Sequence, residues 1–127
     1  EVVFASNASR AMVAGDRGQL AQVIRNLIDN ALKYGAADTP VLAKLEKGAS
    51  GWVVISIIDQ GDGIPAQHMP RLTERFYRAD PGRSRQIGGT GLGLSIVKHI
   101  VERHRGRFDV ASRVGQGTTA TCLFPPF

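Results

Sequence analysis

Cysteine, long apolar stretches and aromatic residues are scarce in this chain of 127 residues. The single cysteine, Cys122, excludes an internal disulfide and a zinc site made of several cysteines. We expect it to pack as a small apolar group in the last strand. The most apolar run, WVVISII at 52–58, has seven residues, far fewer than the roughly 20 that a membrane-spanning helix needs. The N-terminal sequence EVVFASNASR lacks a basic stretch followed by an apolar block, so we expect no signal peptide.

The composition is that of one soluble globular domain over residues 1–127, with 43% hydrophobic and 21% charged residues and no internal repeat. Lysine and arginine outnumber aspartate and glutamate by 16 to 11, which gives a net charge of +5. Five arginines lie within fifteen residues: Arg71, Arg75, Arg78, Arg83 and Arg85. Such a cluster is usually a solvated face, but it also suits a nucleic acid, a phosphate ester or an acidic protein surface.

The spacing of apolar residues predicts an α+β fold, a two-layer sandwich with about three helices on one face of a mixed, mostly antiparallel sheet of about five strands. We expect helices at 16–34, 67–75 and 92–104, and strands at 2–4, 11–14, 41–47, 52–59, 107–113 and 117–124. The first helix is marked by capping-box spacing of Asp16 and Gln19. An apolar stripe follows from Leu20 to Leu32, and Gly35 ends the helix.

Four glycines precede or open the helix expected at 92–104: Gly88, Gly89, Gly91 and Gly93. The N-terminus of a helix has unpaired N–H groups and a partial positive charge, and glycines there let a phosphate approach the backbone. The segment lacks the Lys-Ser/Thr ending of a P-loop. The alternative interpretation is a flexible turn that binds nothing.

A second glycine cluster, DQGDGIPA at 59–66, follows the strand expected at 52–59. It matches the G-x-G-x-x-A pattern of dinucleotide-binding folds, but the helix and parallel strand of such folds do not follow it, so we reject that interpretation. Asp59 ends a buried strand, and its carboxylate, which only accepts hydrogen bonds, could bind the exocyclic amine of adenine and would repel the carbonyl of guanine. Gly61 and Gly63 would keep side chains away from the base. An aspartate in a β-turn explains Asp59 equally well.

Polar side chains gather on one face of the first helix. Asn26, Asn30 and Lys33, with Gln22 before them, lie within about 80° of one another on a helical wheel, nearly opposite the apolar stripe. A solvated face would explain them, but asparagine is a poor helix former, and two at an i, i+4 spacing are an avoidable cost. Asparagine oxygens suit Mg²⁺, Lys33 could neutralise phosphates, and Tyr34 offers an aromatic face to a base.

Taken in chain order, five segments resemble the N, G1, F, G2 and G3 boxes of the ATP-binding domain of bacterial sensor histidine kinases, a branch of the gyrase/histidine-kinase ATPase superfamily. They are NLIDNALKY (26–34), DQGDG (59–63), ERFYR (74–78), GGTGLGLSIVKHI (88–100) and GQGTT (115–119). The resemblance covers nearly the whole chain and looks closest to phosphate-regulon-type sensors. It implies a Bergerat-type ATP-binding fold, with ATP and Mg²⁺ as ligands and a mobile ATP lid at 64–90.

The resemblance implies a role for each matching residue. Asn30 would ligate Mg²⁺, Asn26 and Lys33 would lie near the phosphates, and Tyr34 would lie against the adenine. The base pocket would comprise Asp59 on the adenine amine, with Gly61, Gly63, Ile64 and Thr118 around it.

The resemblance also assigns roles to the lid and the second glycine-rich segment. Phe76 would anchor the lid, while Arg78 and Arg85 would reach the γ-phosphate. The phosphates would be cradled by the backbone of Thr90, Gly91, Leu92, Gly93 and Leu94. The residues closest to the transferred group would thus be Asn26, Lys33, Arg78 and Arg85.

In such kinases the γ-phosphoryl group passes to a histidine on a separate dimerisation domain, as part of two-component signalling. Gyrase-type relatives have a water-activating glutamate where this chain has Asn26, which favours phosphoryl transfer over hydrolysis. His68, His99 and His104 lie in no H-E-x-x-x-P-like context, so we interpret them as surface or packing residues. The chain therefore looks like an excised catalytic domain that lacks the acceptor.

The expected partners are ATP, the phosphoacceptor domain of the same parent protein and a cognate response regulator, with no nucleic acid and no membrane contact by the domain itself. We expect a monomeric cytoplasmic domain of a parent protein anchored in the bacterial inner membrane. Two alternatives remain. One is an ATP-driven conformational clamp of the gyrase type, and the other is a basic nucleic-acid-binding module without catalysis.

Overall fold

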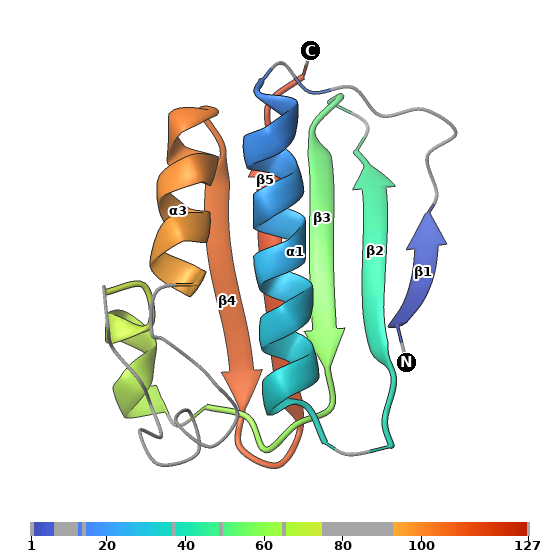
Figure 1. The fold of residues 1–127 in the computed structure, drawn as a ribbon, viewed down its shortest axis with the longest axis vertical. Coiled ribbons are helices and arrows are strands. Elements are labelled where there is room, and N and C mark those ends of the chain that lie inside the picture. The colour runs from blue at the N-terminus through green and yellow to red at the C-terminus, as the bar shows by residue number, and fades with distance from the viewer. Residues whose placement is uncertain are drawn as a thin grey trace.

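The computed structural model describes residues 2–6, 13, 15–36, 38–48, 50–64, 66–74 and 93–126. These residues form two layers, a five-stranded sheet in the order β1-β2-β3-β5-β4 and helices on one of its faces (Figure 1). The elements are β1 (Val2–Ser6), α1 (Arg17–Tyr34), β2 (Val41–Lys47), β3 (Val53–Asp59), the 3-10 helix η1 (Ala66–Arg71), α3 (Gly93–Arg103), β4 (Arg107–Arg113) and β5 (Gly117–Phe124).

The predicted α+β sandwich is confirmed. β1 runs parallel to β2, and the other neighbouring strands are antiparallel, so the sheet is mixed and mostly antiparallel. Most of the strand expected at 11–14 lies outside the described residues, and Val13, which is described, belongs to no strand. None of the described helices combines the length and the apolar character needed to cross a membrane.

Helix α1 begins and ends where the capping signals predict. The Asp16 side chain accepts a hydrogen bond from the Gln19 amide at 2.9 Å, and the Gly35 amide donates to the Ala31 carbonyl at 2.8 Å. In a full capping box, the Gln19 side chain would also accept a hydrogen bond from the Asp16 amide. Here the Asp16 amide donates instead to Nε2 of His104, at 3.0 Å. A residue from the far end of the chain therefore completes this cap.

His104 joins the ends of two helices to the sheet. Its Nδ1 lies 2.7 Å from the Ile100 carbonyl oxygen, which only accepts, so Nδ1 carries the proton and Nε2 accepts from Asp16. The ring meets Phe124 edge to face, with centroids 6.4 Å apart. A methyl group on Gly15 would overlap the same ring. His104 is thus a packing residue, as its sequence context indicated.

The core lies between the helices and the sheet. Its members that are less than 2% exposed are Val23, Leu27, Val53, Val97, Val101, Cys122 and Phe124. Removing an aliphatic or aromatic side chain of this kind from water stabilises a fold by about 1.5–3 kcal/mol. Cys122 packs as predicted, and burial raises the pKa of its thiol to about 12.

Candidate functional site

Asp59 ends β3 on the helix-facing side of the sheet, because it has the same parity as the core residues Val53 and Ile57. The residue is only 8% exposed. Its Oδ1 accepts a hydrogen bond from the Gly61 amide at 2.9 Å. Asp59 thus stabilises a turn, as the alternative interpretation of this residue predicted. A carboxylate has about four acceptor positions, so a role in a turn and a role in binding a donor are compatible.

Three glycines bring the backbone into close contact around Asp59. A methyl group on Gly61 would overlap the carbonyl oxygen of Tyr34, the last residue of α1. Gly63 (φ +79°) and Gly117 (φ +100°) adopt left-handed conformations, and methyl groups there would overlap backbone atoms of adjoining segments. Main-chain contacts therefore require Gly61 and Gly63, a reason beyond the room for a base that the sequence suggested.

The strand register places three polar side chains in one row. Asp59 of β3 lies opposite Thr118 of β5, which lies opposite Ser112 of β4. Directly opposed residues project from the same face, so all three side chains lie on the helix-facing side. Ser112 Oγ lies 2.8 Å from Thr118 Oγ1, donates to the Gly117 carbonyl at 3.0 Å and accepts from the Ile64 amide at 2.8 Å. Four predicted base-pocket residues, Asp59, Gly61, Ile64 and Thr118, thus lie at one corner.

Ser112 belongs to this corner, and sequence reasoning missed it. The only feature of the sequence that points to Ser112 is the alternation of side chains along β4. Ser112 falls on the inward side of that strand, together with the half-buried Phe108 and Val110. A serine at such a position indicates a polar partner above the sheet, but the partner depends on the pairing of β4 with β5 and on the path of the loop after β3.

The predicted polar residues of α1 flank its buried face. Asn26 and Asn30 are half-buried, Lys33 is exposed, and the buried residues are Val23, Leu27 and Ala31. For Asn26 and Asn30, the prediction of a position nearly opposite the apolar stripe is wrong. That stripe included Leu32, which is 48% exposed, so the true buried face is narrower and its centre lies closer to the asparagines.

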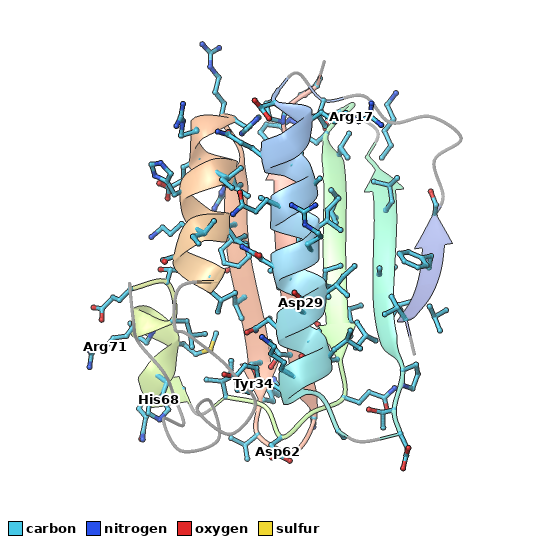
Figure 2. The ribbon with its side chains drawn as sticks, in the orientation of Figure 1. Arg17, Asp29, Tyr34, Asp62, His68 and Arg71 are labelled. Carbon is cyan, nitrogen blue, oxygen red and sulfur yellow. The ribbon has the colours of Figure 1, made fainter. Side chains whose placement is uncertain are left out.

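Three elements meet at the end of the molecule where Asp59 lies. α1 and β3 end there, and α3 begins on the same side (Figure 1). Figure 2 shows Tyr34 at the end of α1, above the loop that carries Asp62. Gly93 is the first residue of α3, and Leu94 packs against the core. The start of α3 therefore turns its N–H groups toward the end that holds Asp59.

Six predicted site residues lie outside the described part of the chain: Phe76, Arg78, Arg85, Thr90, Gly91 and Leu92. Of the expected lid at 64–90, the structure describes Ile64 and residues 66–74. Within it, η1 stands where a helix was expected at 67–75, and Arg71 Nε forms an ion pair with Glu74 Oε2 at 2.8 Å.

Metal binding at this corner would depend on amide oxygens. Among the described residues, no group of three His, Cys, Asp or Glu side chains could hold a metal ion. Asn26 and Asn30, half-buried in the second half of α1, offer side-chain oxygens. Mg²⁺ is commonly held by one or two protein oxygens, several waters and the phosphates of a substrate, so this donor set fits it.

Known proteins resemble this chain in sequence and in fold. Residues 15–127 match the family described as histidine kinase-, DNA gyrase B-, and HSP90-like ATPase. Phosphate regulon sensor protein PhoR of Pseudomonas aeruginosa is 42% identical over 122 residues, which are 94% of this chain and 27% of that protein. The mycobacterial sensor histidine kinase MprB is 31% identical with a TM-score of 0.82, and the match covers 99% of this chain and 84% of that one.

Full-length ShkA, whose structure is a complex with AMPPNP, is 29% identical with a TM-score of 0.84, over 98% of this chain and 25% of that one. The chain thus spans about a quarter of the longer relatives it matches, 27% of PhoR and 25% of ShkA. The family match covers nearly all of the sequence, and the fold is shared with a sensor histidine kinase. The chain belongs to the family of histidine kinase-, DNA gyrase B- and HSP90-like ATPases, on the branch of the sensor histidine kinases.

Proposed function

We propose that this chain is the catalytic domain of a sensor histidine kinase, which binds Mg-ATP and phosphorylates a histidine on a separate dimerisation domain of its parent protein. The observation that carries the proposal is the buried Asp59 at the end of β3, with Gly61 against the end of α1 and Thr118 directly across the sheet. ShkA, a solved relative with the same fold over this chain, is a complex with the ATP analogue AMPPNP, which supports a nucleotide as the ligand.

The base of ATP would bind at the Asp59 corner. The carboxylate would accept a hydrogen bond from the exocyclic amine of adenine and would repel the carbonyl of guanine. Tyr34, half-buried at the end of α1, would lie against the ring, with Gly63 and Ile64 on its other sides. Adenine specificity would thus come from one acidic group held by a rigid turn.

The phosphates would extend along α1 toward the start of α3. Asn30 would hold Mg²⁺ through its side-chain oxygen, and Asn26 and Lys33 would lie near the phosphates. The ion would supply charge neutralisation of the phosphates. The backbone amides from Thr90 to Leu94 would bind the phosphate oxygens, and a lid over 64–90, with Phe76, Arg78 and Arg85, would close on the nucleotide.

In the reaction, the bond between the γ-phosphorus and the bridging oxygen breaks, a bond to a ring nitrogen of the acceptor histidine forms, and ADP leaves. This domain would contribute positioning and charge neutralisation, and the general base beside the acceptor histidine would belong to the separate acceptor domain. Asn26 stands where the resemblance places a water-activating glutamate in gyrase-type ATPases, and an amide takes no proton from water. This favours a kinase over an ATP-driven clamp.

The parent protein would provide the acceptor histidine, and a cognate response regulator would receive the phosphoryl group from it. We place the domain in the cytoplasm of a bacterium, with its parent anchored in the inner membrane. The arginines at 71–85 would then serve the nucleotide, and binding to nucleic acid would be weak and strongly salt-dependent.

The decisive experiment is a calorimetric titration of the chain with ATP, ADP and GTP, each with and without Mg²⁺. We expect ATP and ADP to bind and GTP to bind far more weakly. Asp59→Asn keeps an oxygen for the Gly61 amide but loses the charge, so ATP affinity should fall by about 10- to 150-fold, as expected for one hydrogen bond to a charged group.

The matched control is Asp109→Asn, an exposed carboxylate on the opposite side of the same sheet, which should bind ATP like the wild type. If the Asp59→Asn variant bound ATP as tightly as the wild type, the proposal would be wrong. Steady hydrolysis of ATP by the isolated chain, without transfer to an added acceptor domain, would favour the clamp instead.

A further inference from the structure

The hydroxyl group of Ser112 has three partners and one proton. The Ile64 amide can only donate, so Ser112 accepts from it at 2.8 Å. The Gly117 carbonyl can only accept, so Ser112 donates its proton there at 3.0 Å. Toward Thr118, 2.8 Å away, Ser112 then has only an acceptor position left. We therefore assign the donor role in the Ser112–Thr118 pair to the Thr118 hydroxyl.

This proton count determines what Thr118 can offer to a ligand. With its proton committed to Ser112, Thr118 Oγ1 retains only lone pairs. Thr118 lies directly opposite Asp59, whose carboxylate also accepts. Both side chains across β3 and β5 thus present acceptors, and a group that meets them must be a donor.

We propose that Ser112 is a positioning residue of the base site, which holds Thr118 as a hydrogen-bond acceptor and thereby sharpens the preference for an amine over a carbonyl. The inference rests on the proposed function, since the amine is that of adenine. Ser112 also joins three segments, β4, the start of β5 and the loop after β3, so the same hydroxyl sets the position of Ile64.

The test is the ratio of the Mg-GTP and Mg-ATP dissociation constants. In Ser112→Ala the Thr118 hydroxyl is released and can turn its proton toward the carbonyl of guanine. We expect ATP binding to weaken by about 3- to 10-fold, the range for one neutral hydrogen bond, while GTP binding weakens less or improves. The ratio of dissociation constants should therefore fall. Ser112→Thr keeps the hydroxyl and should keep the wild-type ratio.

The ratio remains informative if a variant folds poorly, because both nucleotides report on the same folded molecules. Ser112→Cys, which keeps the side-chain size with a much weaker donor and acceptor, provides a second variant and should also lower the ratio. The matched control is Ser56→Ala, a buried serine of β3 with opposite parity to Asp59, which should leave the ratio unchanged.

An unchanged ratio in both Ser112→Ala and Ser112→Cys would overturn the role of Ser112. A ratio lowered equally in Ser112→Thr would also overturn it, because shape and not the hydroxyl would then be responsible. Failure of the proposed function looks different: the wild type would show no preference for ATP over GTP, or Asp59→Asn would bind ATP unchanged.

Discussion

At one end of the sandwich the start of α1 meets the end of α3, and at the other end α1 and β3 finish side by side (Figure 1). Both ends hold polar groups. At the first end the polar groups pair with one another, from the Asp16 amide through His104 to the Ile100 carbonyl. At the second end, oxygen atoms of Asp59, Ser112 and Thr118 gather in one row.

The difference teaches how this fold separates stability from binding. A chain of matched donors and acceptors closes on itself, so changes in it should alter the free energy of unfolding and little else. A row of oxygen atoms at the edge of a helix layer suits a ligand that brings donors. Substitutions at the two ends should therefore affect different measurements.

The largest effect is expected at the polar flank of α1. Asn30→Ala removes the side-chain oxygen proposed for Mg²⁺, so Mg²⁺-dependent transfer of phosphate to an added acceptor domain should be abolished. The free energy of unfolding should change by less than about 0.5 kcal/mol, as is usual for a substitution outside the core. Transfer is measured with radiolabelled ATP, and stability by urea unfolding.

The control for this prediction is the neighbouring Asp29, which is exposed on the outer side of α1 (Figure 2). Asp29→Asn should retain transfer. Mg²⁺-dependent transfer by Asn30→Ala at the wild-type rate would contradict the metal assignment and leave α1 with a structural role at both ends.

A pair of glycines compares the two ends directly. Gly61→Ala would overlap the Tyr34 carbonyl, and Gly15→Ala would overlap the His104 ring. Each should lower the free energy of unfolding by about 1–3 kcal/mol, the usual effect of overpacking. Only Gly61→Ala should also weaken ATP binding in calorimetry, because it displaces the Asp59 turn.

Gly48→Ala is the matched control, since an added methyl group there makes only ordinary contact with the Trp52 carbonyl, at 3.8 Å. Stability and binding should both stay at wild-type values. If Gly15→Ala weakened ATP binding as much as Gly61→Ala, the two ends would be coupled and the comparison would fail.

The smallest effect is expected in the core between the two ends. Burial raises the pKa of Cys122 to about 12 from 9.0, so the folded protein holds the thiol proton more tightly than the unfolded chain. This contribution to stability is complete below pH 9 and is lost as the pH rises toward 12. Relative to Cys122→Ala, the wild type should lose about 1 kcal/mol between pH 9 and 10, measured by urea unfolding. A constant difference over that range would contradict it.

Most of the fold could be predicted because its signals are local. The strands at 41–47, 107–113 and 117–124 have the predicted bounds, β3 begins one residue later than predicted, and α3 is one residue shorter than predicted at each end. Alternating and helical apolar patterns indicate which residues of one element are buried. Asp16 and Gly35 mark the ends of α1 because capping depends on the side chain and backbone of the residue at each end. The flank of α1 was misjudged because periodicity counted Leu32 as buried.

The sequence by itself determined the order of the elements, the buried strand that ends in Asp59 and the family boxes, because these depend on residues close together in the chain. Only the tertiary structure decided that Ser112 lies beside Thr118 and Ile64, and that His104 caps α1. The bond between Ile64 and Ser112 joins residues 48 positions apart, and the bond between Asp16 and His104 joins residues 88 positions apart. Their geometry depends on strand register and helix docking, which a local pattern does not encode.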